Sequence, residues 1–498
     1  MAVGAVHSLL DRIAVESPER VAVKTANDAL TYGELREQSR RLASWFVAAG
    51  VKRGDRILIV LPNGPAVVAL VMAASRIGAL FCVISPETKE RHLRHILVDS
   101  EPAFVVAAQG YADPTLGHGS CPVAILERDW AHMLSAPMLD GNWCGISQDP
   151  ACLIYTSGST SLPKAVISSH RNVLFAAAAI QQRLQLLASD IIATVLPLSF
   201  DYGLYQTLLA FQVGATVALG GAAEIGPRLL SAIRDWRASV LPIVPSLGIS
   251  LARLAKRSGA DLPHLRMITN TGAHLSAATV ADLQALFPRA RIFLMFGLTE
   301  CKRTSILDPE DICRKPGSVG RPLPDTECLI LGEDGNELPP GNVGELVVRG
   351  PHVMAGYWRA PELTAMRFRH RGPGIEHALF TGDRCHIDVD GYLYFHGRQD
   401  DIYKQSGFRV SAIEVEAVAS ILDGVEHAAV LSPKDGEPAV LVVTGPVSKT
   451  QVLTGLRAHL EDHKVPPRIL VTQRMPLLPN GKIDKNELRR RTASLVTA

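Results

Sequence analysis

Hydroxyl groups, one glycine and one lysine gather in residues 155–166, directly after the apolar run 151–154. A strand that ends in such a loop offers backbone N–H groups, hydroxyl donors and an ammonium charge, and these suit a phosphate. The spacing differs from a Walker A loop, which requires G-x-x-x-x-G-K-[ST]. A solvated Ser/Thr turn would have a similar composition. The segment therefore favours a phosphate site, with these candidate ligands: Thr156, Ser157, Gly158, Ser159, Thr160 and Lys164.

Five further polar segments follow this loop along the chain. They are Asn-Thr-Gly-Ala-His-Leu-Ser at 270–276, Met-Phe-Gly-Leu-Thr-Glu at 295–300, Phe-Thr-Gly-Asp at 380–383, Gly-Arg-Gln-Asp-Asp at 397–401 with 407–409 and 414–416, and Leu-Pro-Asn-Gly-Lys-Ile-Asp at 478–484. Together with the loop at 155–166, they resemble the motifs of the adenylate-forming enzymes: acyl-CoA synthetases, adenylation domains of peptide synthetases, and luciferases. Each motif is weak alone, but six in order, from about residue 10 to residue 488, are specific.

This resemblance implies a two-step reaction that uses ATP. In the family a carboxylate attacks the α-phosphate to give an acyl-adenylate and pyrophosphate, and a thiol then displaces AMP. The loop at 155–166 would hold the β- and γ-phosphates, and Thr299 would contact the α-phosphate. Glu300 would bind Mg²⁺, because carboxylate oxygens suit this hard cation. The flanking Phe-Gly-x-Thr argues against the alternative that Glu300 is an exposed loop acid.

The resemblance also implies a nucleoside site. Phe296 replaces the tyrosine usual in the family, and its ring can still stack on adenine. Asp383 would accept hydrogen bonds from both ribose hydroxyls, although a turn-forming Asp would also fit after a glycine. The remaining residues of this predicted site are Thr271, Gly272, Ala273, Gly297 and Arg398. Departures from the family pattern remove no essential charge and occur at Ser161, Ala165 and the pair Ala273-His274.

Lys482 is the residue that we expect to matter most for adenylate formation. In the family the lysine of this Pro-x-Gly-Lys pattern bridges the substrate carboxylate and the developing charge on the α-phosphate, a role that suits a flexible ammonium group. Without the resemblance, a solvated loop lysine would be the simpler interpretation. Asp400 matches the hinge after which a C-terminal lid rotates between the two half-reactions. Gly407 matches the segment that lines the thiol tunnel.

Asp201 follows Phe200 where the family begins its acyl pocket. In amino-acid-activating members an aspartate at this position pairs with the substrate ammonium, and an unpaired buried charge would be costly. Alternatively, Asp201 pairs with Arg303 and the substrate is a plain organic or fatty acid. In a third possibility Asp201 binds an amine while Lys302 or Arg303 binds a second carboxylate. We favour an amino acid; the other predicted pocket residues are Tyr202, Tyr205, Ile243 and Thr304.

Alternating helices and strands must position these residues. Residues 31–34 have capping-box spacing and start a predicted helix that Ala49-Gly50 ends. Short apolar runs at 56–61, 80–84, 191–196, 215–219, 240–244, 267–269 and 291–295 predict an α/β fold with largely parallel sheets. Runs at 327–331, 344–349 and 391–396 predict a smaller β-rich subdomain. We expect a large N-terminal domain over 1–399 and a small, mobile α/β lid over 400–498, hinged at Asp400.

Composition narrows the class of protein. The 51 Lys and Arg residues nearly balance the 49 Asp and Glu residues, so nothing suggests a nucleic-acid or membrane partner. Eight cysteines without a C-x-x-C pair predict neither a zinc cluster nor a disulfide framework. Residues 1–10 lack the pattern of a signal peptide, and the apolar stretch 66–84 is interrupted by Ser75 and Arg76. We therefore expect a cytoplasmic protein.

The sequence as a whole predicts an enzyme that activates a carboxylic acid with ATP and transfers it to a thiol. No Gly-Gly-x-Ser-Leu carrier signature follows Lys482, so we expect a freestanding enzyme whose thiol belongs to CoA or to a separate carrier protein. A nucleotide-binding regulatory protein without turnover is the rival class, but it would not need Lys482. Dinucleotide-dependent redox chemistry would need a G-x-G-x-x-G motif after the first strand.

Overall fold

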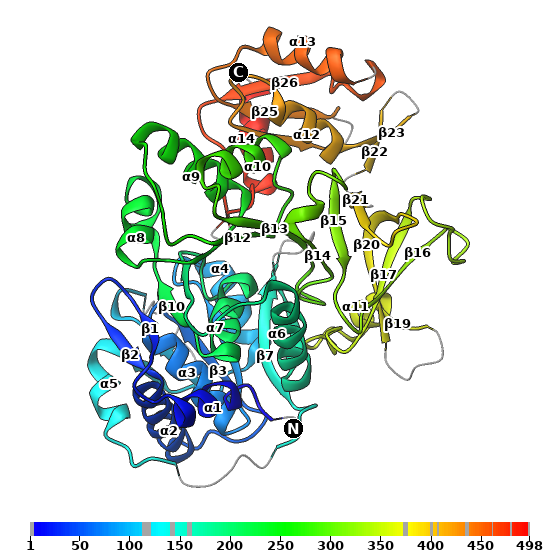
Figure 1. Ribbon diagram of the computed structural model, residues 1–498. Helices are drawn as coiled ribbons and strands as arrows, with labels where there is room; N and C mark the ends of the chain where they lie inside the picture. The colour runs from blue at the N-terminus through cyan, green and yellow to red at the C-terminus, as the bar shows by residue number, and fades with distance from the viewer. Residues whose placement is uncertain are drawn as a thin grey trace.

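In the computed structural model the described residues are 4–111, 121–139, 145–156, 162–371, 377–398, 402–405, 408–433, 438–460, 462–478 and 481–496. They form a mixed α/β fold, which confirms the predicted fold class (Figure 1). The helices are α1 (Ser8–Glu16), α2 (Tyr32–Ala48), α3 (Pro65–Arg76), α4 (Glu90–Ser100), α5 (Leu126–Leu134), α6 (His170–Leu184), α7 (Asp201–Val213), α8 (Leu229–Asp235), α9 (Pro245–Ser258), α10 (Ala277–Leu286), α11 (Pro361–Arg367), α12 (Ala412–Ile421), α13 (Lys449–His459) and α14 (Lys485–Val496).

One sheet carries the loop at 155–166 at the end of a hairpin. Its order is β18-β8-β7-β4-β3-β5-β6. The strands β3 (Arg56–Val60), β4 (Leu80–Ile84), β5 (Phe104–Ala107) and β6 (Val123–Ile125) are parallel. The strands β7 (Pro150–Thr156) and β8 (Lys164–Ser169) pair antiparallel, and β18 (Gly356–Tyr357) covers the edge of β8.

A second, larger sheet changes from parallel to antiparallel pairing along its length. The strands β10 (Thr216–Leu219), β9 (Ile191–Thr194), β11 (Val240–Ile243), β12 (Met267–Asn270) and β13 (Arg291–Phe296) are parallel. Beyond β13 the pairing is antiparallel, through β14 (Ser305–Leu307), β15 (Ser318–Pro322), β21 (Leu393–Arg398), β20 (His377–Ile387), β17 (Gly344–Arg349) and β16 (Glu327–Leu331). At the sheet margins, β1 (Val21–Lys24) pairs β10, β2 (Ala29–Thr31) pairs β1, and β19 (Phe368–His370) pairs β20. The predicted strand runs all fall on strands of these two sheets, and the β-rich part is the antiparallel end.

Local signals in the sequence account for the start and end of α2. The Thr31 hydroxyl accepts a hydrogen bond from the backbone N–H of Glu34, and the Glu34 carboxylate accepts one from the Thr31 N–H, so the predicted capping box is present. Gly50 has φ +88°, the left-handed conformation that commonly follows a helix. Leu42 and Phe46 are completely buried, which fixes the face of α2 that packs on the core.

The apolar stretch 66–84 folds as α3 followed by β4, as predicted. Ser75 and Arg76 are both buried. The Arg76 guanidinium donates to Asp11 at 2.8 Å and to the Ser39 hydroxyl at 2.9 Å, so its charge is paired inside the fold. None of the helices in the described part of the chain combines the length and the apolar composition that a membrane crossing requires.

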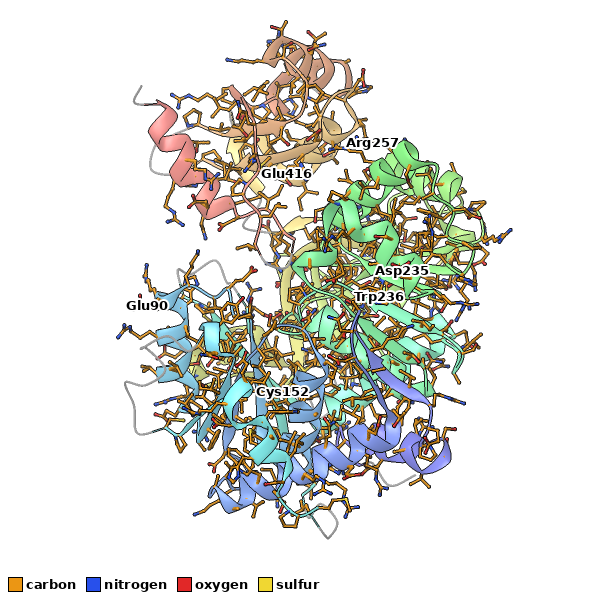
Figure 2. The ribbon with its side chains drawn as sticks, turned by 90° about the vertical axis from the view of Figure 1, so that its left-hand side faces the viewer. Glu90, Cys152, Asp235, Trp236, Arg257 and Glu416 are labelled. Atoms are coloured by element: carbon orange, nitrogen blue, oxygen red, sulfur yellow. The ribbon has the colours of Figure 1, made fainter. Side chains whose placement is uncertain are left out.

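Residues after β21 form what we call the C-terminal unit. It contains β22 (Ile402–Gln405), β23 (Phe408–Ser411) and a sheet of β24 (His427–Leu431), β25 (Val440–Thr444) and β26 (Arg468–Thr472), with α12, α13 and α14. It has its own apolar core, around Val415, Leu441 and Leu456. In Figure 2 this unit, marked by Glu416, stands next to the end of α9, marked by Arg257; Arg253 of α9 forms an ion pair with Glu426 (3.1 Å). The predicted boundary at Asp400 lies outside the described residues and stays a prediction.

Candidate active site

The β7–β8 hairpin presents Thr156 and Lys164 side by side, since these two residues pair across the two strands. Five predicted phosphate-loop positions, residues 157–161, lie outside the described residues; they include Ser157, Gly158, Ser159 and Thr160. Burial lowers the pKa of Lys164, Glu300 opposes this shift, and Arg367 and Arg398 add to it. Lys164 therefore lies in a pocket where other cations are close.

A short hydrogen-bonded chain joins Lys164 to Glu300 through Tyr357. The Tyr357 hydroxyl donates to Oε1 of Glu300 at 2.6 Å and accepts from Nζ of Lys164 at 3.3 Å. Nζ of Lys164 also lies 4.3 Å from the centre of the Tyr357 ring and 4.0 Å from Oε1 of Glu300. Burial and the Glu300 charge both raise the pKa of Tyr357, so its proton stays on the hydroxyl and holds Glu300 in place. Sequence reasoning missed Tyr357, which follows a glycine on the edge strand β18.

Glu300 fits the requirements of a magnesium ligand. Its side chain is 14% exposed, and among the described residues its bonded contacts are to Oε1, which leaves Oε2 available. An anionic oxygen in a polar pocket is the donor that Mg²⁺ prefers, and a hydrogen bond from a neighbouring group commonly orients such a carboxylate. Glu300 would therefore hold the ion, and Mg²⁺ supplies positive charge to phosphate oxygens when bound.

Asp383 and Arg398 face each other across the β20–β21 hairpin. Nε of Arg398 donates to Oδ1 of Asp383 at 3.1 Å, and the two residues pair in register. Asp383 is 1% exposed. Burial raises the pKa of Asp383 to about 6, although Arg398 favours the ionised form. The carboxylate is therefore held in a site where charge is costly, and hydroxyl donors from a ligand would stabilise it.

Five other predicted nucleoside residues lie at the end of β13 or directly after β12 and β13. Gly272 has φ +89°, and a Cβ added there would lie 3.8 Å from Cε of Lys482. A Cβ on Gly297 would lie 2.1 Å from the carbonyl oxygen of Lys302, so this position needs glycine. The Phe296 ring is partly buried and packs on Phe395, with ring centres 5.2 Å apart. The other predicted nucleoside residue here, Ala273, is exposed, and Thr299, predicted to contact the α-phosphate, is partly exposed.

Lys482 reaches the site from the C-terminal unit. The turn that carries it is closed by hydrogen bonds from the Leu478 N–H to the Lys482 carbonyl (2.7 Å) and from the Gly481 N–H to the Leu478 carbonyl (2.8 Å). The Ser246 hydroxyl of α9 donates to the Gly481 carbonyl at 3.2 Å, which fixes the turn against the rest of the chain.

The electrostatic neighbours of Lys482 belong to two different pockets. Lys482 is exposed at the surface, but the protein around it removes part of its hydration. This desolvation lowers its pKa, and the charge of Arg398 lowers it further. The carboxylates that oppose the shift are Asp201, Asp383 and Glu300. The charge of Lys482 is therefore within electrostatic range of the carboxylates of both pockets.

Asp201 begins α7 and forms an ion pair with Lys302, with 3.9 Å between Oδ2 and Nζ. The side chain of Lys302 is 2% exposed and that of Asp201 is 12% exposed. Nζ of Lys302 has no hydrogen-bond partner among the described residues. The carboxylate thus lies near this ammonium group without a direct hydrogen bond to it.

Arg303 adds a second buried cation. It is 6% exposed, its Nη1 donates to the Thr271 hydroxyl at 3.1 Å, and its guanidinium lies 5.0 Å from the centre of the Tyr202 ring. Its Nε has no hydrogen-bond partner within the described part of the chain. Burial lowers the pKa of Arg303, and Tyr202 and Asp201 oppose that shift. The pocket therefore holds two buried cations and one nearby carboxylate.

The remaining predicted pocket residues are all buried. Tyr202 donates its hydroxyl hydrogen bond to the Thr269 carbonyl at 2.8 Å, and Tyr205 is buried with a hydroxyl that has no partner among the described residues. Nζ of Lys302 lies 5.6 Å from the centre of the Tyr205 ring. Ile243 and Thr304 are fully buried, and the Thr304 N–H donates to the Phe296 carbonyl at 2.8 Å. The predicted hinge and tunnel residues, Asp400 and Gly407, lie outside the described residues.

Comparison with known proteins finds a matching family model and relatives with similar sequences and folds. A family model described as AMP-binding enzyme matches residues 10–358. A feruloyl-CoA synthase from Amycolatopsis sp. is 32% identical over 487 residues, which cover 95% of this chain and 96% of that protein. VinN, solved in complex with L-aspartate, is 39% identical with a TM-score of 0.72, and the match covers 79% of this chain and 98% of VinN. ATP-bound MatB from Rhodopseudomonas palustris is 27% identical with a TM-score of 0.88, and the match covers 99% of both chains.

Proposed function

The chain belongs to the AMP-binding enzyme family, and we propose that its acid substrate is an amino acid that carries a second carboxylate. The protein is an AMP-forming ligase that activates a carboxylic acid with ATP. The single observation that carries the proposal is the unequal charge of the acyl pocket. Lys302 and Arg303 are both buried there, and Asp201 is the one carboxylate that forms an ion pair with either of them within the described residues.

A substrate with an amine and a second carboxylate would complete this pocket. Its ammonium group would pair with Asp201, and its second carboxylate would pair with Lys302 and Arg303. Each buried charge would then have an opposite charge, which is the condition for tolerating charges in a dry pocket. The VinN complex supports this assignment, because L-aspartate has an amine and two carboxylates.

The remaining residues fit a reaction in which an oxygen of the activated carboxylate bonds to the α-phosphorus and pyrophosphate leaves with the electron pair of the broken bond. The charge of Lys482 interacts with Asp201, Asp383 and Glu300, which supports a role in which its ammonium group would neutralise charge that develops between the acid and the α-phosphate. Thr299 would contact the α-phosphate, Glu300 would hold Mg²⁺, and Asp383 would accept hydrogen bonds from the ribose hydroxyls. Phe296, with Thr271, Gly272, Ala273 and Gly297, would border the adenine.

The second half-reaction would transfer the acyl group to a phosphopantetheine thiol. The sulfur attacks the acyl carbon, the bond to the adenylate oxygen breaks, and AMP leaves. CoA and a carrier protein present the same reactive arm, so we propose this arm as the acceptor. The enzyme, ATP and the acid are incubated with CoA or with a holo-carrier protein. Mass spectrometry of the products would show which of the two carries the acyl group.

The test of the substrate class is acid-dependent ATP–pyrophosphate exchange with a matched panel. Aspartate is compared with succinate, which lacks the amine, and with alanine and β-alanine, each of which lacks one carboxylate. Losing one buried charge pair costs on the order of 100-fold in kcat/KM, so aspartate-like acids should exceed all three by that factor.

A second candidate function is supported by the feruloyl-CoA synthase relative. Under that alternative the substrate is a plain organic or fatty acid, so the panel also includes ferulate and butyrate. If exchange with ferulate, butyrate or succinate is as fast as exchange with the best amino dicarboxylic acid, the proposed substrate class is wrong and this alternative is favoured.

A further inference from the structure

A polar pocket borders the nucleotide site, and it contains one cation that none of the predicted roles uses. Its walls include Lys164, Glu300, Tyr357, Arg367 and Arg398. These residues come from strand β8, the loop after β13, strand β18, the end of helix α11 and strand β21. The pocket therefore forms only when segments far apart in the sequence come together.

Arg367 lies directly beside the turn that carries Asp383. It is the last residue of α11, and a Cβ added to Gly382 would lie 2.4 Å from its Nη1 and 3.3 Å from its Cζ. Gly382 has φ +71°, and its lack of a side chain lets the guanidinium approach the backbone closely. The charge of Arg367 is thus placed one residue away from the carboxylate that we assign to the ribose.

The hydrogen bonding of Arg367 leaves most of its donors free. Arginine has five N–H donors in a planar fork. In the described part of the chain Arg367 makes one hydrogen bond, from Nη1 to the Phe380 carbonyl at 3.2 Å, and no ion pair. A neutral carbonyl does not compensate a full positive charge. The other donors remain available for an anion that enters the pocket.

The other cations of the pocket each have a carboxylate of their own. Lys164 lies 4.0 Å from Glu300, and Arg398 lies 3.1 Å from Asp383. Arg367 is therefore the cation in excess among the described wall residues. It also adds to the lowering of the Lys164 pKa, so its charge is felt at the end of the phosphate loop.

We propose that Arg367 binds the pyrophosphate half of ATP and stabilises it as the leaving group. When the acid oxygen bonds to the α-phosphorus, the bond from that phosphorus to the bridging oxygen breaks and the electron pair leaves with pyrophosphate. A guanidinium group suits this product because its planar fork matches phosphate oxygens. The proposal depends on the AMP-forming reaction and is independent of which acid is activated.

The experiment compares Arg367→Gln with a matched control, Arg369→Gln. Arg369 is exposed, donates to the Met366 carbonyl at 2.8 Å and lies over the Phe380 ring at 4.5 Å, so it has similar neighbours but does not line the pocket. The measurements are the KM values for pyrophosphate and ATP in the exchange reaction and the Kd of AMP. AMP lacks the pyrophosphate half, so it reports whether the Gly382–Asp383 turn is intact.

We expect Arg367→Gln to raise the KM for pyrophosphate and for ATP by about 10- to 100-fold, the usual effect of losing charged hydrogen bonds. The Kd of AMP should stay within about 2-fold, Arg367→Lys should recover part of the loss, and Arg369→Gln should resemble the wild type. Equal weakening of AMP and pyrophosphate would overturn the proposal, because Arg367 would then only support the turn. An unchanged KM for pyrophosphate would overturn it as well. If Arg367→Gln does not fold, Arg367→Lys decides: a raised KM for pyrophosphate with normal AMP binding supports the proposal, and wild-type values for both contradict it.

Discussion

In the nucleotide pocket both carboxylates face cations of the same protein: Glu300 lies 4.0 Å from Lys164, and Asp383 lies 3.1 Å from Arg398. In the acyl pocket two buried cations share one carboxylate, and the ion pair of 3.9 Å between Lys302 and Asp201 is not a hydrogen bond. The nucleotide pocket also contains Arg367, which forms no ion pair within the described residues, and we have proposed that the pyrophosphate half of ATP pairs with it. Among the described residues each pocket therefore has one cation more than it has carboxylates. ATP supplies the missing negative charge in the nucleotide pocket, and we propose that the acid supplies it in the acyl pocket.

Lys482 connects the two pockets, and its removal should have the largest effect. We expect Lys482→Ala to slow acid-dependent ATP–pyrophosphate exchange by about 100- to 1000-fold, which corresponds to roughly 2.7–4 kcal/mol for one charge contact in the transition state. Thioester formation from a chemically prepared adenylate should change much less, because the acid is then already bonded to the α-phosphate.

Lys485→Ala is the matched control for this variant. Lys485 lies three residues further along the same C-terminal unit, pairs with Glu416 at 2.9 Å and is not among the wall residues of the nucleotide pocket. It should leave exchange unchanged. An exchange rate of Lys482→Ala within a few-fold of the control would remove Lys482 from the first half-reaction.

The second prediction concerns stability in the acyl pocket. Asp201→Asn leaves Lys302 and Arg303 buried without a carboxylate, so the free energy of unfolding should fall by about 3 kcal/mol, the lower end for breaking a buried ion pair. Lys302→Met removes the excess cation, so it should leave the protein as stable as the wild type or more stable. The Asp201→Asn/Lys302→Met double variant should recover part of the loss.

Thermal unfolding of the wild type, the two single variants and the double variant measures this coupling. The same four proteins are compared with and without aspartate, because a bound second carboxylate should stabilise the wild type more than Lys302→Met. Additive effects of the two substitutions would show that Asp201 and Lys302 do not interact, and the charge argument for the substrate would then fail.

The sequence predicted the elements and motifs that depend on local pattern. The capping box at Thr31, the strands of both parallel regions and the order of the six motifs are all visible in short windows. The fold brings residues from four of those motifs, Lys164, Glu300, Gly382 and Arg398, to one pocket, with Asp383 bonded to Arg398 and Lys482 within electrostatic range. Tyr357 and Arg367 could not be predicted, because their contacts depend on the edge pairing of β18 with β8 and on the packing of α11 against Gly382.

The partner of Asp201 was also beyond sequence reasoning. The sequence indicated Arg303 as the protein group that competes for Asp201, but the ion pair in the structure is with the adjacent Lys302, so that pairing was wrong. Lys302 has φ +56°, the left-handed conformation, which is uncommon for residues other than glycine. This local backbone conformation helps to direct the Lys302 side chain to Asp201 while Arg303 reaches Thr271. The carbonyl oxygen of Lys302 also packs closely against Gly297, and neither feature has a signature in the residue types.

The smallest expected effect is on the nucleotide side, at Asp383. Burial raises the pKa of this carboxyl to about 6. An acid with a raised pKa binds its proton more tightly in the folded state, so its contribution to stability falls as pH rises from about 4 to 6 and stays unfavourable above. Asp383→Asn should therefore not destabilise the protein at pH 8, and a gain of about 1 kcal/mol is expected once the cost of burying the amide is included. This is the opposite sign to Asp201→Asn.

The advantage of Asp383→Asn should shrink below pH 6, where the wild-type carboxyl becomes protonated. AMP binding supplies the second readout: the Kd of the wild type should rise as pH falls through about 6, because a protonated carboxyl accepts ribose hydroxyl donors less well. The variant should bind AMP more weakly at pH 8 and show little change with pH. Thermal unfolding and AMP titrations at pH 5, 6, 7 and 8 test both trends. A variant that is less stable than the wild type at pH 8 would mean that the Arg398 pair outweighs the cost of burial, and the contrast between the two pockets would then be one of substrate binding alone.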